Sequence, residues 1–168
     1  MSGTSHPVVI ALDVGGTGMK CALVRPDGTV HHAERHPTPA ARGPEVVVAT
    51  ILDVAAGLAE RARADGADPV AAGVAVPGVV DEEDGVAVWS ANVGFRDVPL
   101  RDLVAKRLGL PTALGHDVRT GGQLGREERR CQQVAIRVPR AGHDRDLAAA
   151  RAIWEEDDEI DALHDQVY

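Results

Sequence analysis

The stretch that decides the fold is IALDVGGTGMK, which runs from Ile10 to Lys20. It begins inside an apolar, β-branched run, Val8–Leu12, of the kind that forms a fully buried strand. Asp13 follows this run, and the adjacent glycines Gly15 and Gly16 come two residues later. Two glycines in a tight turn let backbone N–H groups approach an anion closely and accept positive φ without Cβ strain. The stretch therefore predicts a buried strand that leads into a phosphate-binding turn.

The alternative for the same residues is an ordinary Gly-Gly hairpin that closes two strands. The complete pattern D-x-G-G-T-x-x-K, from Asp13 to Lys20, favours the phosphate loop. Within it Thr17 adds a hydroxyl, and Asp13 is placed to orient a Mg²⁺-bound water near the phosphates. The two commoner phosphate loops, G-x-x-x-x-G-K-[ST] and a helix-opening G-x-G-x-x-G, do not follow this strand.

This pattern resembles the first phosphate loop of the sugar kinases in the actin-like ATPase superfamily, and in particular of the ROK family (repressors, uncharacterised frames and sugar kinases). The resemblance implies an α/β fold with a ribonuclease-H-like domain, ATP and Mg²⁺ as cofactors, and a small-molecule sugar as substrate. It also implies that Asp13, Gly15, Gly16, Thr17 and Lys20 bind the nucleotide's phosphates.

Composition and charge narrow the class of protein. The 168 residues suit one domain or one domain with an appendage, and a net charge of −8 argues against non-specific binding to nucleic acid or to an anionic membrane. No apolar run reaches the length of a membrane span, and the first residues do not form a signal peptide. Cys21 and Cys131 are too few and too far apart for a disulfide framework or a metal knuckle. We expect a cytoplasmic protein.

Hydrophobic periodicity predicts alternating strands and helices through the first part of the chain. Three strands are expected first, then helix, strand, helix, strand and helix, which is the order of a ribonuclease-H-like half-domain with a mixed sheet. The expected strands are Val8–Val14, Met19–Pro26, Thr29–His36, Val70–Gly78 and Pro111–Val118, and the expected helices include Glu45–Ala64 and Pro99–Leu108. Asp27-Gly28 and Asp84-Gly85 predict hairpin turns.

Several polar residues follow the predicted strands directly. Asp13, Gly78 and the pair His116 and Asp117 all stand at carboxyl ends of strands. Ligands of open α/β sheets bind beyond the carboxyl ends of the strands. The strand pattern therefore supports a single ligand site at this edge, independently of the family resemblance.

Two further segments resemble ROK sequences on the sugar-binding side. In Gly73–Phe95 the resemblance implies that Asn92 hydrogen-bonds sugar hydroxyls and that Gly78 lets the chain pass close to the ligand. The alternative for Asn92 is that it caps a turn before Gly94.

The segment Leu114–Gly122 resembles the family element whose aspartate is the catalytic base. The resemblance implies that Asp117 is this base and that it lies beside the bound sugar. The alternative, compatible with the first, is that Asp117 caps the amino terminus of a helix. His116 stands where the family has asparagine; it can still hydrogen-bond a sugar, but the change puts hexose specificity in doubt.

Three histidines, His31, His32 and His36, lie in the third predicted strand. Because side chains alternate in direction along a strand, they are not expected to meet at one metal ion. We expect them to be surface residues.

The resemblance to the kinases ends near residue 125, which divides the chain into a domain of residues 1–125 and a charged helical tail of residues 126–168. The zinc-binding and adenosine-binding elements of the family's second domain do not follow. Residues 145–168 resemble part of a repeat of the phosphate-uptake regulator (PhoU) family, in which Asp157, Asp161 and His164 are candidate metal ligands on one helix face. A solvated acidic face is the simpler alternative. The tail is expected to be truncated or fused, and to pack on the first domain, pair with another chain as in a homo-oligomer, or fray.

Three functional hypotheses remain open at this point. The first is an ATP-dependent sugar kinase of the ROK type, acting on a hexose or N-acetylhexosamine and weakened or inactivated by the missing second domain. The second is a non-catalytic sugar-binding or regulatory module, and the third is a chimaeric gene fragment without activity.

Overall fold

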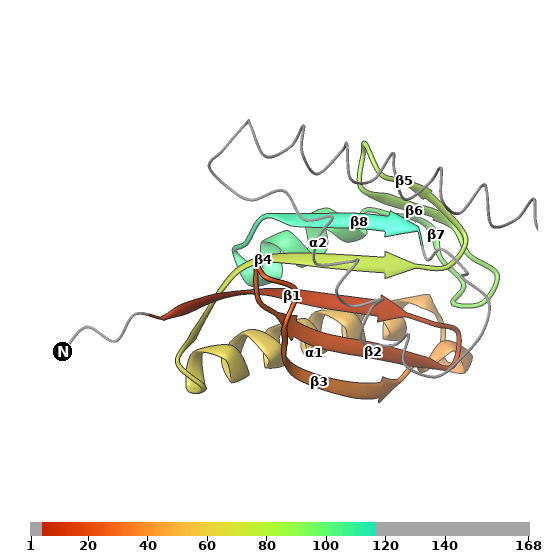
Figure 1. The fold of residues 1–168 in the computed structure, drawn as a ribbon. Coiled ribbons are helices and arrows are strands. Elements are labelled where there is room, and N and C mark those ends of the chain that lie inside the picture. The colour runs from red at the N-terminus through yellow and green to blue at the C-terminus, as the bar shows by residue number, and fades with distance from the viewer. Residues whose placement is uncertain (1–4, 117–168) are drawn as a thin grey trace, which may run out of the picture.

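The computed structural model describes residues 5–116, which form a mixed five-stranded sheet covered by two helices (Figure 1). The sheet has the order β3-β2-β1-β4-β8. Its strands are β1 (His6–Val14), β2 (Gly18–Val24), β3 (Val30–Pro37), β4 (Ala67–Val76) and β8 (Thr112–His116). The first three strands are antiparallel neighbours, whereas β4 and β8 run parallel to β1. The predicted α/β fold with a mixed sheet is confirmed.

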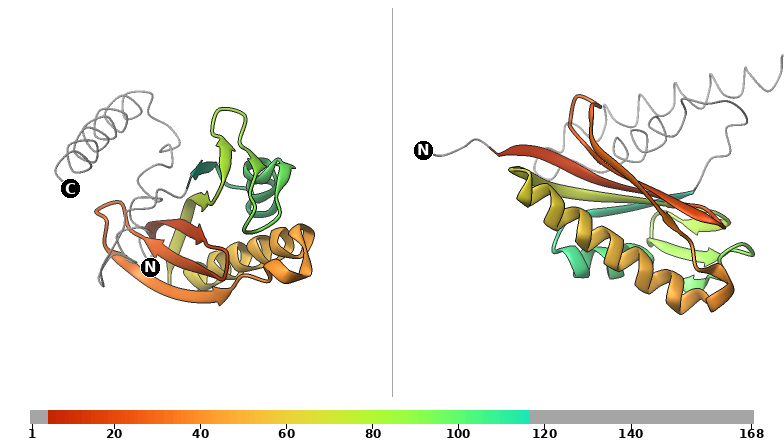
Figure 2. Two further views of the ribbon diagram at one scale, coloured as in Figure 1. Left: turned by 90° about the vertical axis from the view of Figure 1, so that its right-hand side faces the viewer. Right: turned by 90° about the horizontal axis from the view of Figure 1, so that it is seen from below.

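Both long helices cover the same face of this sheet (Figure 2). Helix α1 (Pro44–Ala64) connects β3 to β4 by way of the short 3₁₀ turn η1 (Ala40–Arg42), and α2 (Leu100–Leu108) precedes β8. The helical spacing of apolar residues in α1 buries Val47, Ile51 and Leu58 completely against the strands. Helix α2 begins one residue later than predicted, because Pro99 is its N-cap, and it ends at Leu108, where Gly109 caps it in the left-handed conformation.

Between β4 and α2 the chain forms a second, three-stranded antiparallel sheet, which the expected element order lacks, although the predicted hairpin at Asp84-Gly85 is confirmed as the turn between its first two strands. It contains β5 (Val79–Asp81), β6 (Val86–Trp89) and β7 (Arg96–Val98) in sequence order. Figure 1 shows it at the end of the molecule towards which β4 and β8 point. Phe95, the chain's one phenylalanine, is fully buried there and joins this sheet to the main core.

The bounds of all five main-sheet strands differ from the sequence prediction by one to three residues at one or both ends, and two of the differences coincide with local irregularities. Strand β4 begins at Ala67 rather than Val70, and it includes Pro69. A shift in register leaves Val70 without a partner on β1, since Val8 pairs with Pro69 and Val9 with Ala71. The predicted two-residue hairpin at Asp27-Gly28 is confirmed as a hairpin, but its loop spans residues 25–29.

Candidate functional site

The three parallel strands end together at one edge of the sheet, as the sequence predicts. Asp13 of β1 is paired with Ala75 of β4, and Val76 of β4 is paired with His116 of β8. Because neighbouring strands lie about 4.8 Å apart, the ends of β1 and β8 are about 10 Å from each other with β4 between them. This spacing is suitable for a small-molecule ligand.

The glycine turn joins β1 to β2 and has a geometry that only glycine allows. The N–H of Gly15 donates to the carbonyl of Gly18 at 2.9 Å, and a Cβ on Gly15 would stand 2.9 Å from that same oxygen. The carbonyl of Thr17 accepts the N–H of Thr38 at 3.1 Å, which fixes the turn to the end of β3. The N–H groups of Gly16 and Thr17 make no hydrogen bond within residues 5–116, so they are the two turn amides that remain for an anion.

Asp13 and Lys20 lie on the same face beside this turn, because they are direct partners across β1 and β2. Asp13 is only 5% exposed, and carboxylates are seldom buried to this extent unless they are paired or have a specific role. A buried carboxylate, a lysine on the facing strand and two available amides fit a phosphate group with its divalent cation. The donor set at this turn is therefore compatible with Mg²⁺ and ATP.

Asn92 lies directly against the glycine turn. A Cβ on Gly16 would be 3.2 Å from the Cβ of Asn92, so glycine at position 16 lets the turn and the Asn92 side chain approach closely. Asn92 belongs to the turn between β6 and β7, which is closed by backbone hydrogen bonds from Ser90 to Phe95 and from Gly94 to Ser90. Within the described residues the Asn92 side chain makes no hydrogen bond of its own in closing this turn. The structure thus brings together Gly16, predicted to bind phosphate, and Asn92, predicted to bind the sugar.

The packing of the fold itself explains why residue 78 is a glycine. Its φ is +102°, and a Cβ there would stand 2.1 Å from the carbonyl oxygen of Trp89 and 2.8 Å from the Cα of Ser90. Gly78 therefore permits the close crossing of β6 over the end of β4. Its predicted contact with the ligand stays a prediction.

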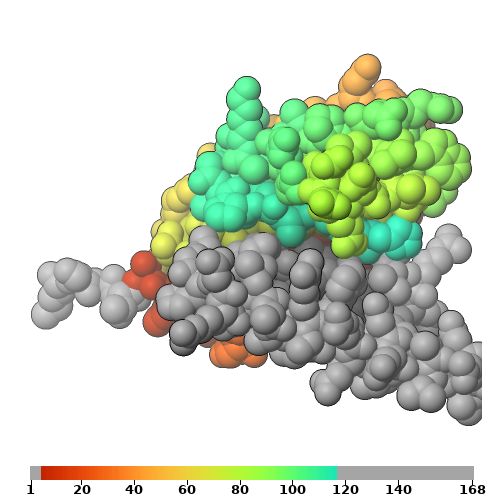
Figure 3. Space-filling view, turned by 90° about the horizontal axis from the view of Figure 1, so that it is seen from above, coloured from red at the N-terminus to blue at the C-terminus, as the bar shows by residue number. Residues whose placement is uncertain are grey.

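His116 is the last residue of β8, and it is exposed at the edge where β1, β4 and β8 end, which we call the ligand edge. Its backbone N–H donates to the Glu82 carboxylate at 3.3 Å. Figure 3 shows this end of β8 beside the β5–β6 hairpin that carries Glu82. The predicted base Asp117 follows His116 directly in the sequence and lies outside the described residues, as do the candidate metal ligands Asp157, Asp161 and His164.

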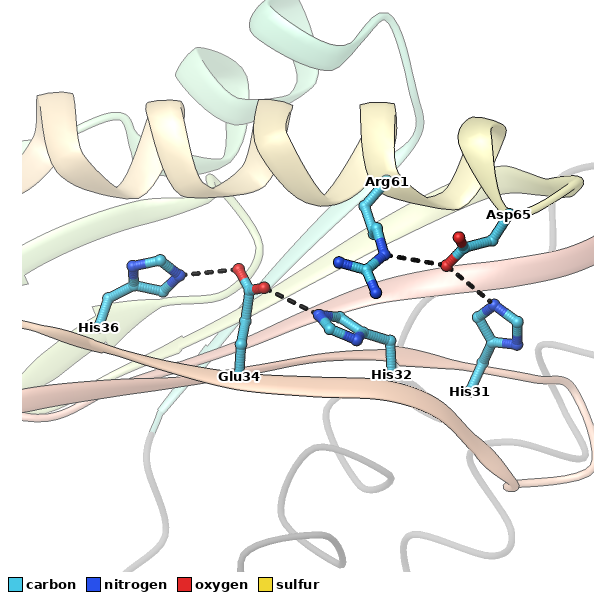
Figure 4. A network of polar contacts seen from close by, with 6 residues as sticks. All are labelled: His31, His32, Glu34, His36, Arg61 and Asp65. Atoms are coloured by element: carbon cyan, nitrogen blue, oxygen red, sulfur yellow. Dashed lines mark hydrogen bonds and ion pairs between the residues drawn. The ribbon is translucent and has the colours of Figure 1, made fainter.

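The histidines of β3 form a polar network beneath α1 (Figure 4). His36 pairs with Met19 and so stands close to the glycine turn, whereas His31 and His32 lie further along β3. The expected alternation of side chains is wrong at His31: Leu23 pairs with His32 and Val24 with Val30, so His31 is an extra residue in a bulge. His31 and His32 consequently both extend towards α1 (Figure 4). They are partly buried rather than exposed.

Glu34 is the centre of this network. Its two oxygens accept hydrogen bonds from the Nε2 atoms of His32, at 2.8 Å, and of His36, at 2.7 Å. Burial raises the pKa of Glu34, but the two hydrogen bonds and the charge interactions with His32 and His36 together lower it by more, so the net pKa lies below its usual value. Within residues 5–116, no group of three or more histidine, cysteine, aspartate or glutamate side chains is arranged to hold a metal ion.

Comparison with known proteins agrees with the geometry of the ligand edge. The sequence pattern of the ROK family matches residues 9–138. This chain belongs to the ROK family. The match extends past residue 125, into the segment expected to be the tail, while the resemblance of residues 145–168 to phosphate-uptake regulators stays a prediction. Between residues 5 and 116, no helix is both long and apolar enough to cross a membrane.

Individual relatives include kinases and a regulator. The glucokinase of Streptomyces coelicolor is 31% identical over 110 residues, which cover 66% of this chain and 32% of the glucokinase. A ROK family glucokinase from Streptomyces griseus, solved in complex with glucose and AMPPNP, is 30% identical with a TM-score of 0.55, over 64% of this chain and 32% of its own. A putative xylose repressor from a Caldicellulosiruptor species is 35% identical over 49 residues, which cover 29% of this chain and 12% of the repressor. The chain thus spans about a third of the length of the glucokinases it matches.

Proposed function

We propose that this ROK domain serves the ATP-dependent phosphorylation of a hydroxyl group on a hexose or N-acetylhexosamine. The observation that carries the proposal is the contact between the glycine turn and Asn92, where a Cβ on Gly16 would be 3.2 Å from the Asn92 Cβ. A phosphate-binding turn and an amide suited to sugar hydroxyls are thereby adjacent, as phosphoryl transfer between nucleotide and sugar requires.

Each group at the edge has a defined part in the proposed reaction. The amides of Gly16 and Thr17, with Lys20, hold the phosphates of ATP, while Asn92 and His116 orient the sugar. Asp117 accepts the proton of the attacking hydroxyl, whose oxygen forms a bond to the γ-phosphorus as the bond to the ADP oxygen breaks. Asp13 would hold Mg²⁺, and the ion would supply positive charge beside the phosphate oxygens.

A coupled assay of phosphoryl transfer from ATP to a panel of hexoses and N-acetylhexosamines tests this proposal. The native chain is expected to phosphorylate at least one sugar, and Asp117→Asn is expected to lower turnover by at least about 100-fold. Asp68→Asn is the matched control, because Asp68 is exposed near the start of β4, at the opposite end of the strands. Equal turnover by Asp117→Asn and the native chain would contradict the role of Asp117 as base.

The second candidate function is a non-catalytic sugar-sensing module, and the local similarity to a xylose repressor favours it. This candidate predicts sugar binding by calorimetry without transfer from ATP. If the native chain neither binds nor phosphorylates any sugar of the panel, both candidates fail.

A further inference from the structure

Two large apolar side chains stand exposed together on the second sheet. They are Trp89 of β6, which is 46% exposed, and Val79 of β5, which is 56% exposed, and they are direct partners in the pairing of these strands. Within residues 5–116 the only other large apolar side chain exposed to this degree is Val70, near the start of β4. Single apolar side chains are common on protein surfaces, but an exposed tryptophan beside a second apolar side chain points to a contact surface.

This exposed pair borders the ligand edge. Val79 follows Gly78, with which the chain leaves the end of β4, and the backbone of Trp89 crosses directly over Gly78. Trp89 is also the last residue of β6, and the turn that follows it carries Asn92, which contacts the glycine turn at Gly16. The pair therefore stands beside the place where the phosphate-binding turn and the sugar-binding amide meet.

Trp89 is exposed although its backbone is firmly held. The next residue, Ser90, donates its N–H to the carbonyl of Phe95 at 3.1 Å, and its own carbonyl accepts the N–H of Gly94 at 2.8 Å. Phe95 and Ala87, on either side of Trp89 in the sequence, are both buried in the main core. The exposed indole is thus a property of the folded sheet and not of a loose strand end. A rigid, exposed aromatic ring loses little conformational entropy when it binds a ligand.

The chemistry of a sugar ring matches this combination of groups. A pyranose has hydroxyl groups around its rim, which need donors and acceptors such as the Asn92 amide. Its faces carry C–H groups, which are apolar and weakly positive, and these pack favourably on the negative face of an aromatic ring. Because Trp89 and Asn92 are three residues apart, their Cα atoms are separated by at most about 11 Å. One sugar can therefore reach both side chains.

We propose that Trp89 is a sugar-binding residue, and that its indole ring packs against the C–H face of a pyranose whose hydroxyls are bound by Asn92. Val79 extends the apolar surface beside the indole. This inference rests on the proposed function, because it takes a sugar as the ligand of this edge. It adds an apolar contact to a site whose other groups are polar, and the contact forms no covalent bond.

The fluorescence of Trp89 itself gives the first test. Trp154 is the chain's other tryptophan, so Trp154→Phe leaves Trp89 as the single tryptophan of the full chain. Calorimetry with D-glucose and N-acetyl-D-glucosamine shows which of the two this variant binds. Saturation with the bound sugar should shift the Trp89 emission to shorter wavelength and lower its quenching by acrylamide, because the ring is covered from water. A non-hydrolysable ATP analogue with Mg²⁺, added without sugar, should change neither quantity.

Substitution of the ring gives the second test. Trp89→Ala should raise the Kd of the bound sugar by about 5- to 20-fold, because the apolar surface that the sugar covers is lost. Trp89→Phe keeps an aromatic face and should stay within about threefold of the native Kd. Val70→Ala is the matched control, because it removes an exposed apolar side chain at the opposite end of β4 from the ligand edge, and it should leave the Kd unchanged. The fluorescence test keeps the native ring, so it decides the question even if Trp89→Ala does not fold.

Two results would overturn the inference while leaving the proposed function intact. One is sugar binding with unchanged Trp89 emission and quenching, and the other is an equal sugar Kd for Trp89→Ala and Val70→Ala. An emission shift caused by the nucleotide alone would also overturn it, because the ring would then belong to the nucleotide site. A shift that follows protein concentration without any ligand, together with a dimer in sedimentation, would assign the ring to a second copy of the chain instead. Absence of sugar binding by the native chain would overturn the proposed function and this inference together.

Discussion

Replacing Gly78 by alanine tests the close crossing that holds the second sheet against the first. Gly78 has φ +102°, a conformation that L residues rarely adopt, and the added Cβ would stand 2.1 Å from the Trp89 carbonyl oxygen. Since real Cβ contacts essentially never fall under 3.0 Å, the two backbones would have to separate by about 0.9 Å. Neither neighbour is the flexible end of a side chain, so the strain cannot be relieved by a rotamer change.

Two costs combine in this variant. The positive φ costs about 1–3 kcal/mol for a residue with a Cβ, and forcing extra volume into a packed crossing costs about 1–3 kcal/mol more. We therefore expect Gly78→Ala to lower the free energy of unfolding by about 4 kcal/mol. Because domains of this kind are stable by only about 5–15 kcal/mol, this is a large share of the total. The corresponding fall in Tm is about 8–16 °C.

Chemical denaturation and thermal melts of Gly78→Ala and of Gly28→Ala give the measurement. Gly28 is the matched control, because its φ of +86° is similar but nothing lies within 4 Å of an added Cβ. Gly28→Ala should therefore lose only the part of the free energy that is due to φ, about 1–2 kcal/mol. Equal losses in the two variants would refute the close crossing as the reason for glycine at position 78.

Three further predictions concern the turn, the core and the polar network. Gly16→Ala should change the free energy of unfolding by less than about 1 kcal/mol, yet it should weaken sugar binding, measured by calorimetry, by about tenfold. The added Cβ would stand 3.2 Å from the Asn92 Cβ and displace Asn92 by a few tenths of an ångström. Unchanged sugar affinity would contradict this prediction. Phe95→Ala should lower the free energy of unfolding, measured by urea denaturation, by about 3–5 kcal/mol, because the ring is 0% exposed. A loss below about 1.5 kcal/mol would show that the ring is not part of the core. Because the pKa of Glu34 is lowered by folding, its contribution to stability is present above about pH 4.5 and is lost as the pH falls through the folded-state pKa. The native chain should accordingly lose its stability advantage over Glu34→Gln between about pH 5 and pH 3, and a pH-independent difference would count against the hydrogen bonds to the carboxylate.

The main sheet and its helices could be predicted from the sequence because their signals are local. The apolar run at Val8–Leu12 predicted a buried strand, and the spacing of apolar residues in 45–64 predicted the long helix. The placement of Asp13 and His116 at one edge followed from the order of the strands alone, since parallel strands share their carboxyl edge.

The parts that were not predicted depend on contacts between distant segments. Strands β5 and β7 have three residues each, too few to show a periodic pattern. The bulge at His31 depends on how β3 pairs with β2, and no sequence signal within β3 specifies that pairing. Trp89 was missed as a candidate site residue for the same reason, since its place at the ligand edge depends on how β6 pairs with β5 and crosses the end of β4.

Mapping ligand contacts on the ¹⁵N-labelled chain tests the nucleotide and sugar site most directly. Titration with Mg²⁺ and a non-hydrolysable ATP analogue should move the amide resonances of Gly16 and Thr17, and titration with a bound hexose should move those of Asn92 and His116. Both sets of residues belong to one edge of the sheet, and Gly16 contacts Asn92. Each ligand should therefore also shift the amide resonance of the residue on the other side of this contact. Resonance changes confined to other parts of the sheet, or none with either ligand, would contradict the claim that this edge is a nucleotide and sugar site.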